Sequence, residues 1–212
     1  MAYDLEEQES IDQMKAWWDT WGTPVTAVVC VACLGFAAWN GWNWYQRNEA
    51  AKAGAAYIQL QNAVIQNDAK NVSSISEGML EHYGSTIYGP LSAFAAAQAA
   101  LSQGDFDGAA QKLSWVIDQG SHPEYDTVAR IRLAGVYFDA GKLDDALKVL
   151  DGAKAEPSQK PALLDRRGDV LRAKGDVAGA RAAYEEAIKL LPASQPAMRR
   201  LIELKLGSLP SA

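Results

Sequence analysis

A long stretch without any charged side chain, between Asp19 and Arg47, constrains the fold more than any other feature of this sequence. Its most apolar part is residues 24–45, PVTAVVCVACLGFAAWNGWNWY. These 22 residues would extend roughly 33 Å as a helix, and the hydrocarbon core of a bilayer is about 30 Å thick. Pro24 is tolerated in the first turn of a helix, where its missing N–H has no partner to lose. The stretch therefore predicts a transmembrane helix at residues 24–45.

Six of the seven tryptophans flank this stretch. They are Trp17, Trp18 and Trp21 before it, and Trp39, Trp42 and Trp44 at its C-terminal end. Indole rings favour the membrane–water interface, where the apolar ring meets lipid and the N–H meets water. A buried helix of a soluble protein has no reason for such flanks. We expect the six rings to form a membrane-interface belt, with membrane lipid as a partner.

Residues 1–23 are acidic, with six carboxylates against the single Lys15. A cleaved signal peptide would have a basic start and an apolar core of about 7–15 residues, so we interpret residues 24–45 as an uncleaved anchor. Within the tail, residues 10–21 place four apolar side chains on one helical face. This pattern predicts a short amphipathic helix along the membrane surface, with the chain turning into the membrane at Gly22. The apolar residues are Ile11, Met14, Trp18 and Trp21.

The distribution of Lys and Arg leaves the orientation of the anchor open. Lys15 precedes the span, and Arg47 and Lys52 follow it. By the positive-inside rule this small difference leans towards a cytoplasmic C-terminal part. The rest of the chain holds 19 basic and 20 acidic residues without a basic stripe, so we expect no nucleic acid as a partner.

The two cysteines, Cys30 and Cys33, lie inside the apolar stretch with CxxC spacing. A redox motif needs a polar setting that stabilises a thiolate, and a structural zinc site needs four ligands. Neither setting is present, so we interpret both as small apolar side chains. The two histidines, His82 and His122, have no nucleophile or metal ligand at a telling spacing. The sequence predicts a protein that is not an enzyme, without cofactor or metal.

Sequence repeats indicate the fold of the remaining chain. Residues 161–194 match the tetratricopeptide pattern at its 34-residue period. In this pattern small residues let two antiparallel helices approach closely, large ones fill the seam, and Gly175 separates the helices. The matching residues are Leu164, Gly168, Leu171, Ala180, Tyr184, Ala187 and Pro192.

Two further copies precede this one. A shift of 34 residues gives Arg130, Ala134, Tyr137, Gly141, Ala146, Leu150 and Ala153, and a further shift of 37 gives a weaker copy around Gly104, Ala109, Leu113 and Val116. We expect connecting helices at 46–88, with helices at 46–67 and 72–83, and repeats at 89–206. The helix at 195–206 would cap the array, because a solenoid needs a covered end. The predicted fold class is all-α, with a single transmembrane helix followed by a tetratricopeptide-like solenoid of helical hairpins.

The first helices of such repeats line a concave surface, and positions 2, 5, 9 and 12 of each helix should face it. An apolar stretch followed by a charged end would suit a polypeptide with exposed hydrophobic residues. The alternative, which the sequence leaves open, is that Leu91, Phe94 and Ile131 pack under the helices at 46–83. The positions are Leu91, Phe94, Gln98 and Leu101, then Val128, Ile131, Gly135 and Phe138, then Ala162, Asp165, Asp169 and Arg172.

Three stretches of this chain resemble the ancillary SecYEG translocon subunits, a bacterial family of tetratricopeptide-like membrane proteins. They are YDLEEQESIDQMKAWWDTWG with the span after it, YGPLSAFAAAQAAL with GDFDGAAQKL, and ARIRLAGVYFDAGKLDDALKVLD with DRRGDVLRAKGDVAGARAAYEEAI. The resemblance covers most of the chain. The tail with its span is specific to the family, whereas the repeats alone are shared with many unrelated proteins.

The resemblance implies a bacterial inner-membrane protein with a cytoplasmic N-terminus and periplasmic repeats. It implies three kinds of partner: the Sec translocon, a membrane-anchored periplasmic prolyl-isomerase-like chaperone, and nascent secreted polypeptides. The expected function is a scaffold that helps to pass secreted polypeptides from the translocon to periplasmic chaperones. Arg47 and Lys52 do not favour this orientation. The alternative function is a structural subunit of another envelope assembly, without contact to client chains.

Overall fold

The computed structural model describes the backbone of residues 2–119 and 121–210, and side chains from residue 9 onward. Within these ranges the regular secondary structure is all helical, with no strand, so the predicted all-α class is confirmed. The helices are α1 (Ala2–Ile65), α2 (Ala69–Tyr83), α3 (Tyr88–Ser102), α4 (Phe106–Gln119), the 3-10 helix η1 (Pro123–Tyr125), α5 (Asp126–Asp139), α6 (Leu143–Asp151), α7 (Lys160–Ala173), α8 (Val177–Leu190) and α9 (Pro196–Gly207).

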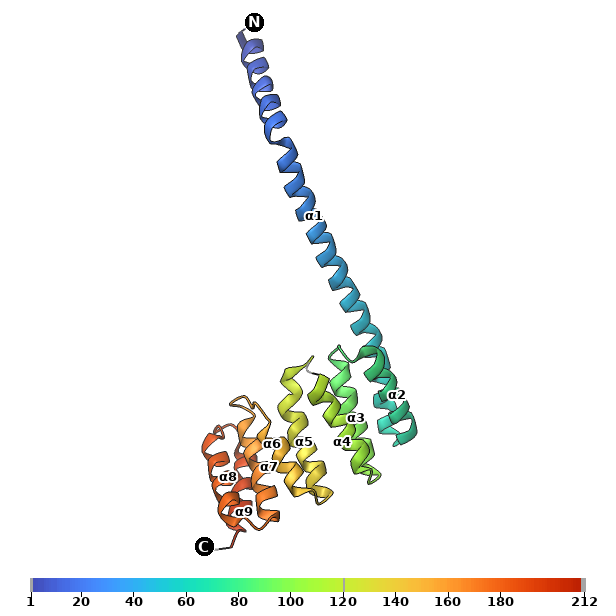
Figure 1. The fold of residues 1–212 in the computed structure, drawn as a ribbon, viewed down its shortest axis with the longest axis vertical. Helices are drawn as coiled ribbons and strands as arrows, with labels where there is room; N and C mark the ends of the chain where they lie inside the picture. Colours follow the sequence, from blue (N-terminus) through green and yellow to red (C-terminus); the bar gives the residue numbers. More distant parts are fainter. Residues whose placement is uncertain (1, 120, 211–212) are drawn as a thin grey trace. The chain divides into compact units, whose positions relative to one another are not determined.

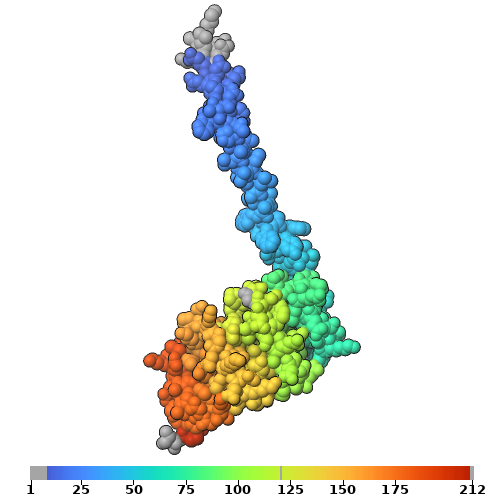
Figure 2. Space-filling model, in the orientation of Figure 1, coloured from blue at the N-terminus to red at the C-terminus, as the bar shows by residue number. Residues whose placement is uncertain are grey.

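Two compact units make up the chain, Met1–Glu49 and Ala50–Ala212. In the first unit the side chains described, from residue 9 onward, are exposed almost all round, and Figure 2 shows a column one helix thick. Leu34, near the middle of the predicted span, is 71% exposed. Helix α1 contains one window long and apolar enough to cross a membrane. Only 6% of that window is buried in protein, so its apolar side chains do not form part of a protein core in the part of the chain that the structure describes.

Helix α1 continues through Gly22 and Pro24, so the turn predicted at Gly22 is absent. The Trp18 ring covers Gly22, where an added Cβ would lie 3.1 Å from the ring. A proline inside a helix loses one backbone hydrogen bond and costs about 3 kcal/mol. The helical turns on either side of Pro24 keep their own backbone hydrogen bonds. The local cost of the proline therefore does not divide α1 into two helices.

In the second unit, three helical hairpins follow one another: α3–α4, α5–α6 and α7–α8 (Figure 1). Each hairpin turns at a glycine with positive φ, namely Gly104, Gly141 and Gly175, a conformation that glycine adopts without strain. In the first and third hairpins an aspartate directly after the glycine caps the next helix, since Asp105 and Asp176 each accept a hydrogen bond of 2.9 Å from a backbone N–H three residues later.

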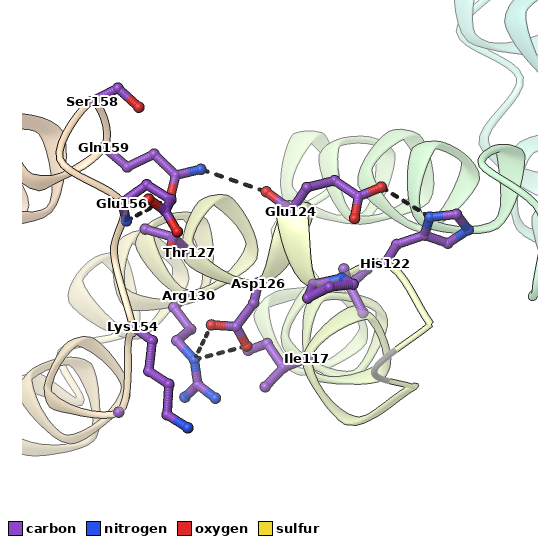
Figure 3. Close-up of a pocket in the computed structure, with 13 residues that line it drawn as sticks. Ile117, His122, Glu124, Asp126, Thr127, Arg130, Lys154, Glu156, Ser158 and Gln159 are labelled. Carbon is purple, nitrogen blue, oxygen red and sulfur yellow. Dashed lines mark hydrogen bonds and ion pairs between the residues drawn. The ribbon is translucent and has the colours of Figure 1, made fainter.

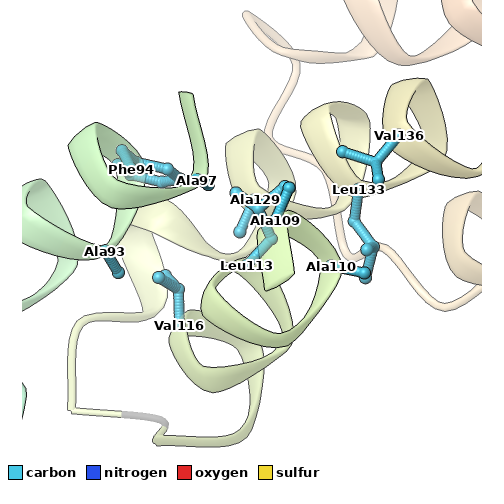
Figure 4. Close-up of a cluster of buried hydrophobic side chains, with 10 residues drawn as sticks. All are labelled: Ala93, Phe94, Ala97, Ala109, Ala110, Leu113, Val116, Ala129, Leu133 and Val136. Atoms are coloured by element: carbon cyan, nitrogen blue, oxygen red, sulfur yellow. The ribbon is translucent and has the colours of Figure 1, made fainter. Parts of the chain in front are cut away.

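Small residues allow the helices of each hairpin to pack closely. At Gly168 an added Cβ would lie 2.4 Å from the Tyr184 ring, so only glycine permits this approach. The central core joins α3, α4 and α5 through Leu113, Val116 and Leu133 among alanines (Figure 4). At the C-terminal end, Ile202 of α9 is fully buried against Tyr184, so α9 covers the last hairpin.

The end of α1 and helix α2 pack on α3. Leu60, Ala63, Val72, Met79 and Ala96 form their shared core. Asn67 has a φ of 53° between the two helices. Helix α2 begins three residues earlier than predicted, because Asp68 caps it by accepting a hydrogen bond from the Asn71 N–H at 3.1 Å.

Candidate functional site

A groove of about 640 Å³ lies among the first helices of the three hairpins, α3, α5 and α7. Five residues predicted for the concave face line it: Leu91, Phe94, Gln98 and Leu101 of α3, and Gly135 of α5. The remaining lining residues are Tyr57, Ala95, Ala97, Leu113, Arg132, Val136, Asp139 and Arg166.

Phe94 forms the floor of this groove. Its side chain is only 8% exposed and belongs to the central core. The ring packs edge-to-face on Tyr125, with centroids 5.9 Å apart. On its groove side the guanidinium carbon of Arg132 lies 4.6 Å from the ring centroid, within the range of a cation–π interaction. The Phe94 ring therefore positions the charged Arg132 side chain at the groove surface.

The three large apolar residues predicted from α5 are not among the groove lining. Val128 packs on the core shared with α3 and α4. Ile131 and Phe138 pack on the core shared with α6 and α7. Helix α5 instead lines the groove with Arg132, Gly135, Asp139 and the buried Val136, because its larger apolar side chains pack between neighbouring hairpins.

The charged residues predicted from α7 bind the C-terminal helix. Lys205 of α9 donates to Asp165 Oδ1 at 2.7 Å and to Asp169 Oδ2 at 2.8 Å. The buried Tyr184 hydroxyl donates to Asp169 Oδ1 at 2.8 Å, and Arg172 donates to the Ser208 hydroxyl at 3.4 Å. Asp165, Asp169 and Arg172 therefore bind α9, the helix that covers the end of the repeats, and are not available to a ligand in the groove.

Burial controls the acid–base properties of this cluster. It raises the pKa of the Asp165 carboxyl, although the hydrogen bond and charge of Lys205 act in the opposite direction. Burial, together with the hydrogen bond to Asp169, also raises the pKa of the Tyr184 hydroxyl. Tyr184 therefore remains a neutral donor at any physiological pH.

The helices at 46–83 do not fill the groove. From α1 only Tyr57 is among the lining residues. The core of α1 and α2 meets α3 at Ala96, with Ala95 and Ala99 beside it. From α2, Leu80 reaches the edge of the Phe94 core. Phe94 and Ile131 are packed, but not mainly under the helices at 46–83 as the alternative predicted. The cluster around Phe94 includes only Leu80 from those helices, and the cluster around Ile131 includes none of their residues.

Sequence reasoning missed the groove's arginines. Arg132 and Arg166 occupy the same position in successive repeats, 34 residues apart. That recurrence was a usable signal. Tyr57 had no comparable signal, because its position depends on how α1 packs on α3.

A second pocket, of about 590 Å³, lies between the connectors that precede α5 and α7 (Figure 3). Its main polar groups are already paired. Arg130 Nε donates to Asp126 at 2.9 Å, and His122 Nδ1 lies 3.0 Å from Glu124. Gln159 donates to the Glu124 carbonyl at 3.5 Å. The pocket joins two connectors, and its acidic and basic groups do not favour one sign of ligand.

The predicted belt tryptophans lie in two groups on α1. Trp21 and Trp39 are separated by 18 residues, about 27 Å along a helix. All six rings are more than half exposed. Among the residues whose side chains the structure describes, no group of three His, Cys, Asp or Glu could hold a metal ion.

Fold and groove together define a helical-repeat protein with an exposed apolar N-terminal helix. A family model for a tetratricopeptide repeat-like domain matches residues 15–211. The crystal structure of nearly identical TPR-like repeats from Podosopora anserina has a TM-score of 0.52 at 16% identity, covering 74% of this chain and 82% of that one. At this identity the likeness supports the repeat fold alone.

Three relatives share the name ancillary SecYEG translocon subunit. The protein of Aggregatibacter actinomycetemcomitans is 30% identical, over 99% of this chain and all of the relative. That of Haemophilus influenzae is 29% identical over 88% of this chain and 91% of the relative, and that of Escherichia coli is 28% identical over 78% of each. The chain belongs to the ancillary SecYEG translocon subunit family, as the resemblance predicted.

Proposed function

We propose that this chain is a membrane-anchored scaffold that associates with the Sec translocon and binds secreted polypeptides in the groove. The observation that supports this most is the match along nearly the whole chain to relatives named as translocon subunits. The open groove with its apolar α3 wall adds a place for an unfolded segment. The family match supports a Sec-associated scaffold role, and the hand-over of clients to periplasmic chaperones is part of the proposal.

In this proposal residues 24–45 cross the inner membrane and residues 1–23 lie in the cytoplasm. Residues 46–88 connect the anchor to the repeats at 89–206, which lie in the periplasm. A membrane-anchored prolyl-isomerase-like chaperone would be the receiving partner. Confinement near the translocon exit raises the effective concentration of a client towards the millimolar range, so even weak groove binding would be useful.

Site-specific photocrosslinking tests the groove. A photoreactive residue at Gln98 or Leu101, both in the groove lining, should crosslink to a translocating secreted polypeptide. The matched control is Lys148, which is exposed on α6 away from the groove lining. Equal crosslinking from the control would contradict the groove assignment. Phe94 and Ile131 are unsuitable for this test, because both pack in cores.

Purification of the full chain in mild detergent tests the assembly. Translocon subunits and a membrane-anchored chaperone should be enriched over an unrelated single-span protein. If a different envelope complex is enriched and Gln98 gives no client crosslinks, the chain is a structural subunit of that assembly. Protease treatment of intact spheroplasts tests the orientation, since periplasmic repeats would be degraded and cytoplasmic repeats protected.

A further inference from the structure

We propose that the groove continues into a neighbouring apolar pocket, and that the two together select polypeptide segments with an aliphatic side chain near a carboxylate. This inference rests on the proposed polypeptide binding and specifies its substrate class. The pocket has a volume of about 340 Å³ and lies where α1, α2 and α3 meet. Ala95 and Gln98 line both the pocket and the groove, so the two spaces adjoin at α3.

The walls of the pocket are small and mostly aliphatic. Val64, Val72, Ala95 and Ala99 provide its apolar surface. Val64 remains 39% exposed, so part of this surface is in contact with water when the site is empty. Burying an aliphatic side chain here is favourable by about 25 cal/mol per Å² of apolar area removed from water. The remaining lining residues are Asn67, Ala69, Gln98, Ser102 and Gln103.

The groove has two basic side chains and one acidic one. Among the described side chains, no carboxylate lies within ion-pair distance of Arg132. Its guanidinium group lies over the Phe94 ring. The acidic partner of Arg166 is Asp169 at 3.9 Å, which already accepts from Lys205 and Tyr184. Both guanidinium groups therefore keep donors for a ligand carboxylate, and such charge-assisted bonds are about twice as strong as neutral ones.

Gln98 lies at the junction of the two sections. Its side chain is exposed, and its amide offers both donors and acceptors. These groups suit the backbone of an extended peptide that passes from the pocket to the arginines. From the pocket across Gln98 to the arginines of α5 and α7, the order of chemistry is thus aliphatic, amide and basic. This order fits a segment with an aliphatic residue on one side and Asp or Glu on the other.

Peptide binding to the full chain in nanodiscs of zwitterionic lipid tests this inference. Four fluorescent peptides would carry Leu and Glu a few residues apart, Leu and Gln, Ser and Glu, or Ser and Gln. Fluorescence anisotropy should give the lowest Kd for the first. Each single replacement should weaken binding about tenfold, corresponding to 1.4 kcal/mol. Equal affinity for the four peptides, or no binding of any, overturns the inference.

Protein variants identify the two sections. Arg132→Gln and Arg166→Gln should reduce the preference for Glu over Gln, and Arg200→Gln, which changes an exposed arginine on α9, should not. Ala99→Leu should fill the pocket and reduce the preference for Leu over Ser. Val64→Ser serves the same purpose if Ala99→Leu disturbs the fold. Circular dichroism confirms that each variant is folded.

An anionic lipid headgroup is the competing ligand for the arginines. If Arg132→Gln weakens binding to phosphatidylglycerol vesicles and leaves the Glu preference unchanged, the basic section is a lipid site and the inference is wrong. Failure of these peptide tests would not affect co-purification with the translocon. The inference and the proposed function can therefore fail separately.

Discussion

The ammonium group of Lys205 in α9 lies 2.7 Å from Asp165 Oδ1 in α7. This ion pair joins the two helices through residues that are 40 positions apart in the sequence. The same ammonium group lies 2.8 Å from Asp169 Oδ2. One lysine of α9 thus pairs with two partly buried carboxylates of α7. Because a solenoid has an uncovered apolar end without its last helix, this contact contributes to the stability of the repeat domain.

Replacing Lys205 with Met should destabilise the repeat domain. The change leaves Asp165 and Asp169 partly buried without their cation, which we expect to cost roughly 2 kcal/mol after allowance for partial exposure. Urea unfolding followed by circular dichroism measures the free energy of unfolding. Lys189→Met, at an exposed lysine on α8, is the control. If both variants unfold at the same urea concentration, Lys205 does not hold the cap.

The same cluster predicts a pH dependence. Burial raises the pKa of folded Asp165 above its ordinary value of 3.8. The folded state therefore binds more protons than the unfolded state in the window just above pH 3.8, and stability falls as pH rises through that window. Asp165→Asn removes this contribution. The unfolding free energy of the unmodified protein minus that of the variant should decrease from pH 3 to about pH 6, and an increase would contradict the assigned direction.

Local sterics made the hairpins predictable from sequence. Gly141 and Gly175 recur at the repeat period and adopt the positive φ that the turns need. Gly168 recurs as a small residue because the Tyr184 ring occupies the space where its Cβ would lie. These constraints act over a few residues or within one hairpin, so a period in the sequence reports them directly.

The groove was only partly predictable, because the face that a helix presents depends on all its neighbours. The repeat position of Ile131 predicts a place on the concave face, whereas its apolar side chain packs on the core shared with α6 and α7. Asp165 was assigned as a charged groove end, and its partner lies 40 residues away. The turn expected at Gly22 is absent for a different, local reason: α1 continues on both sides of Pro24 despite the backbone hydrogen bond that a proline removes.

Gly168→Ala should lower the thermal stability of the repeats. The new methyl group would lie 2.4 Å from the Tyr184 ring, and such overpacking typically costs about 1–3 kcal/mol. Gly78→Ala is the matched control, because Gly78 is inside α2 and a methyl group added there would meet no neighbouring atom within 4 Å. The control should be stabilised by up to about 1 kcal/mol through helix propensity. A melting temperature for Gly168→Ala at or above that of Gly78→Ala would refute the close helix approach.

Two exposed apolar residues of α1 distinguish the membrane anchor from the rest of the helix. Leu34 is 71% exposed and Ile65 is 77% exposed, but only Leu34 lies within the predicted span. An arginine near the centre of a transmembrane helix costs about 2.5–3.5 kcal/mol on insertion scales. Leu34→Arg should therefore reduce the fraction of the protein retained in carbonate-washed membranes, whereas Ile65→Arg should not. Since the two residues have similar exposure on one helix, equal retention of both variants would mean that lipid does not surround Leu34.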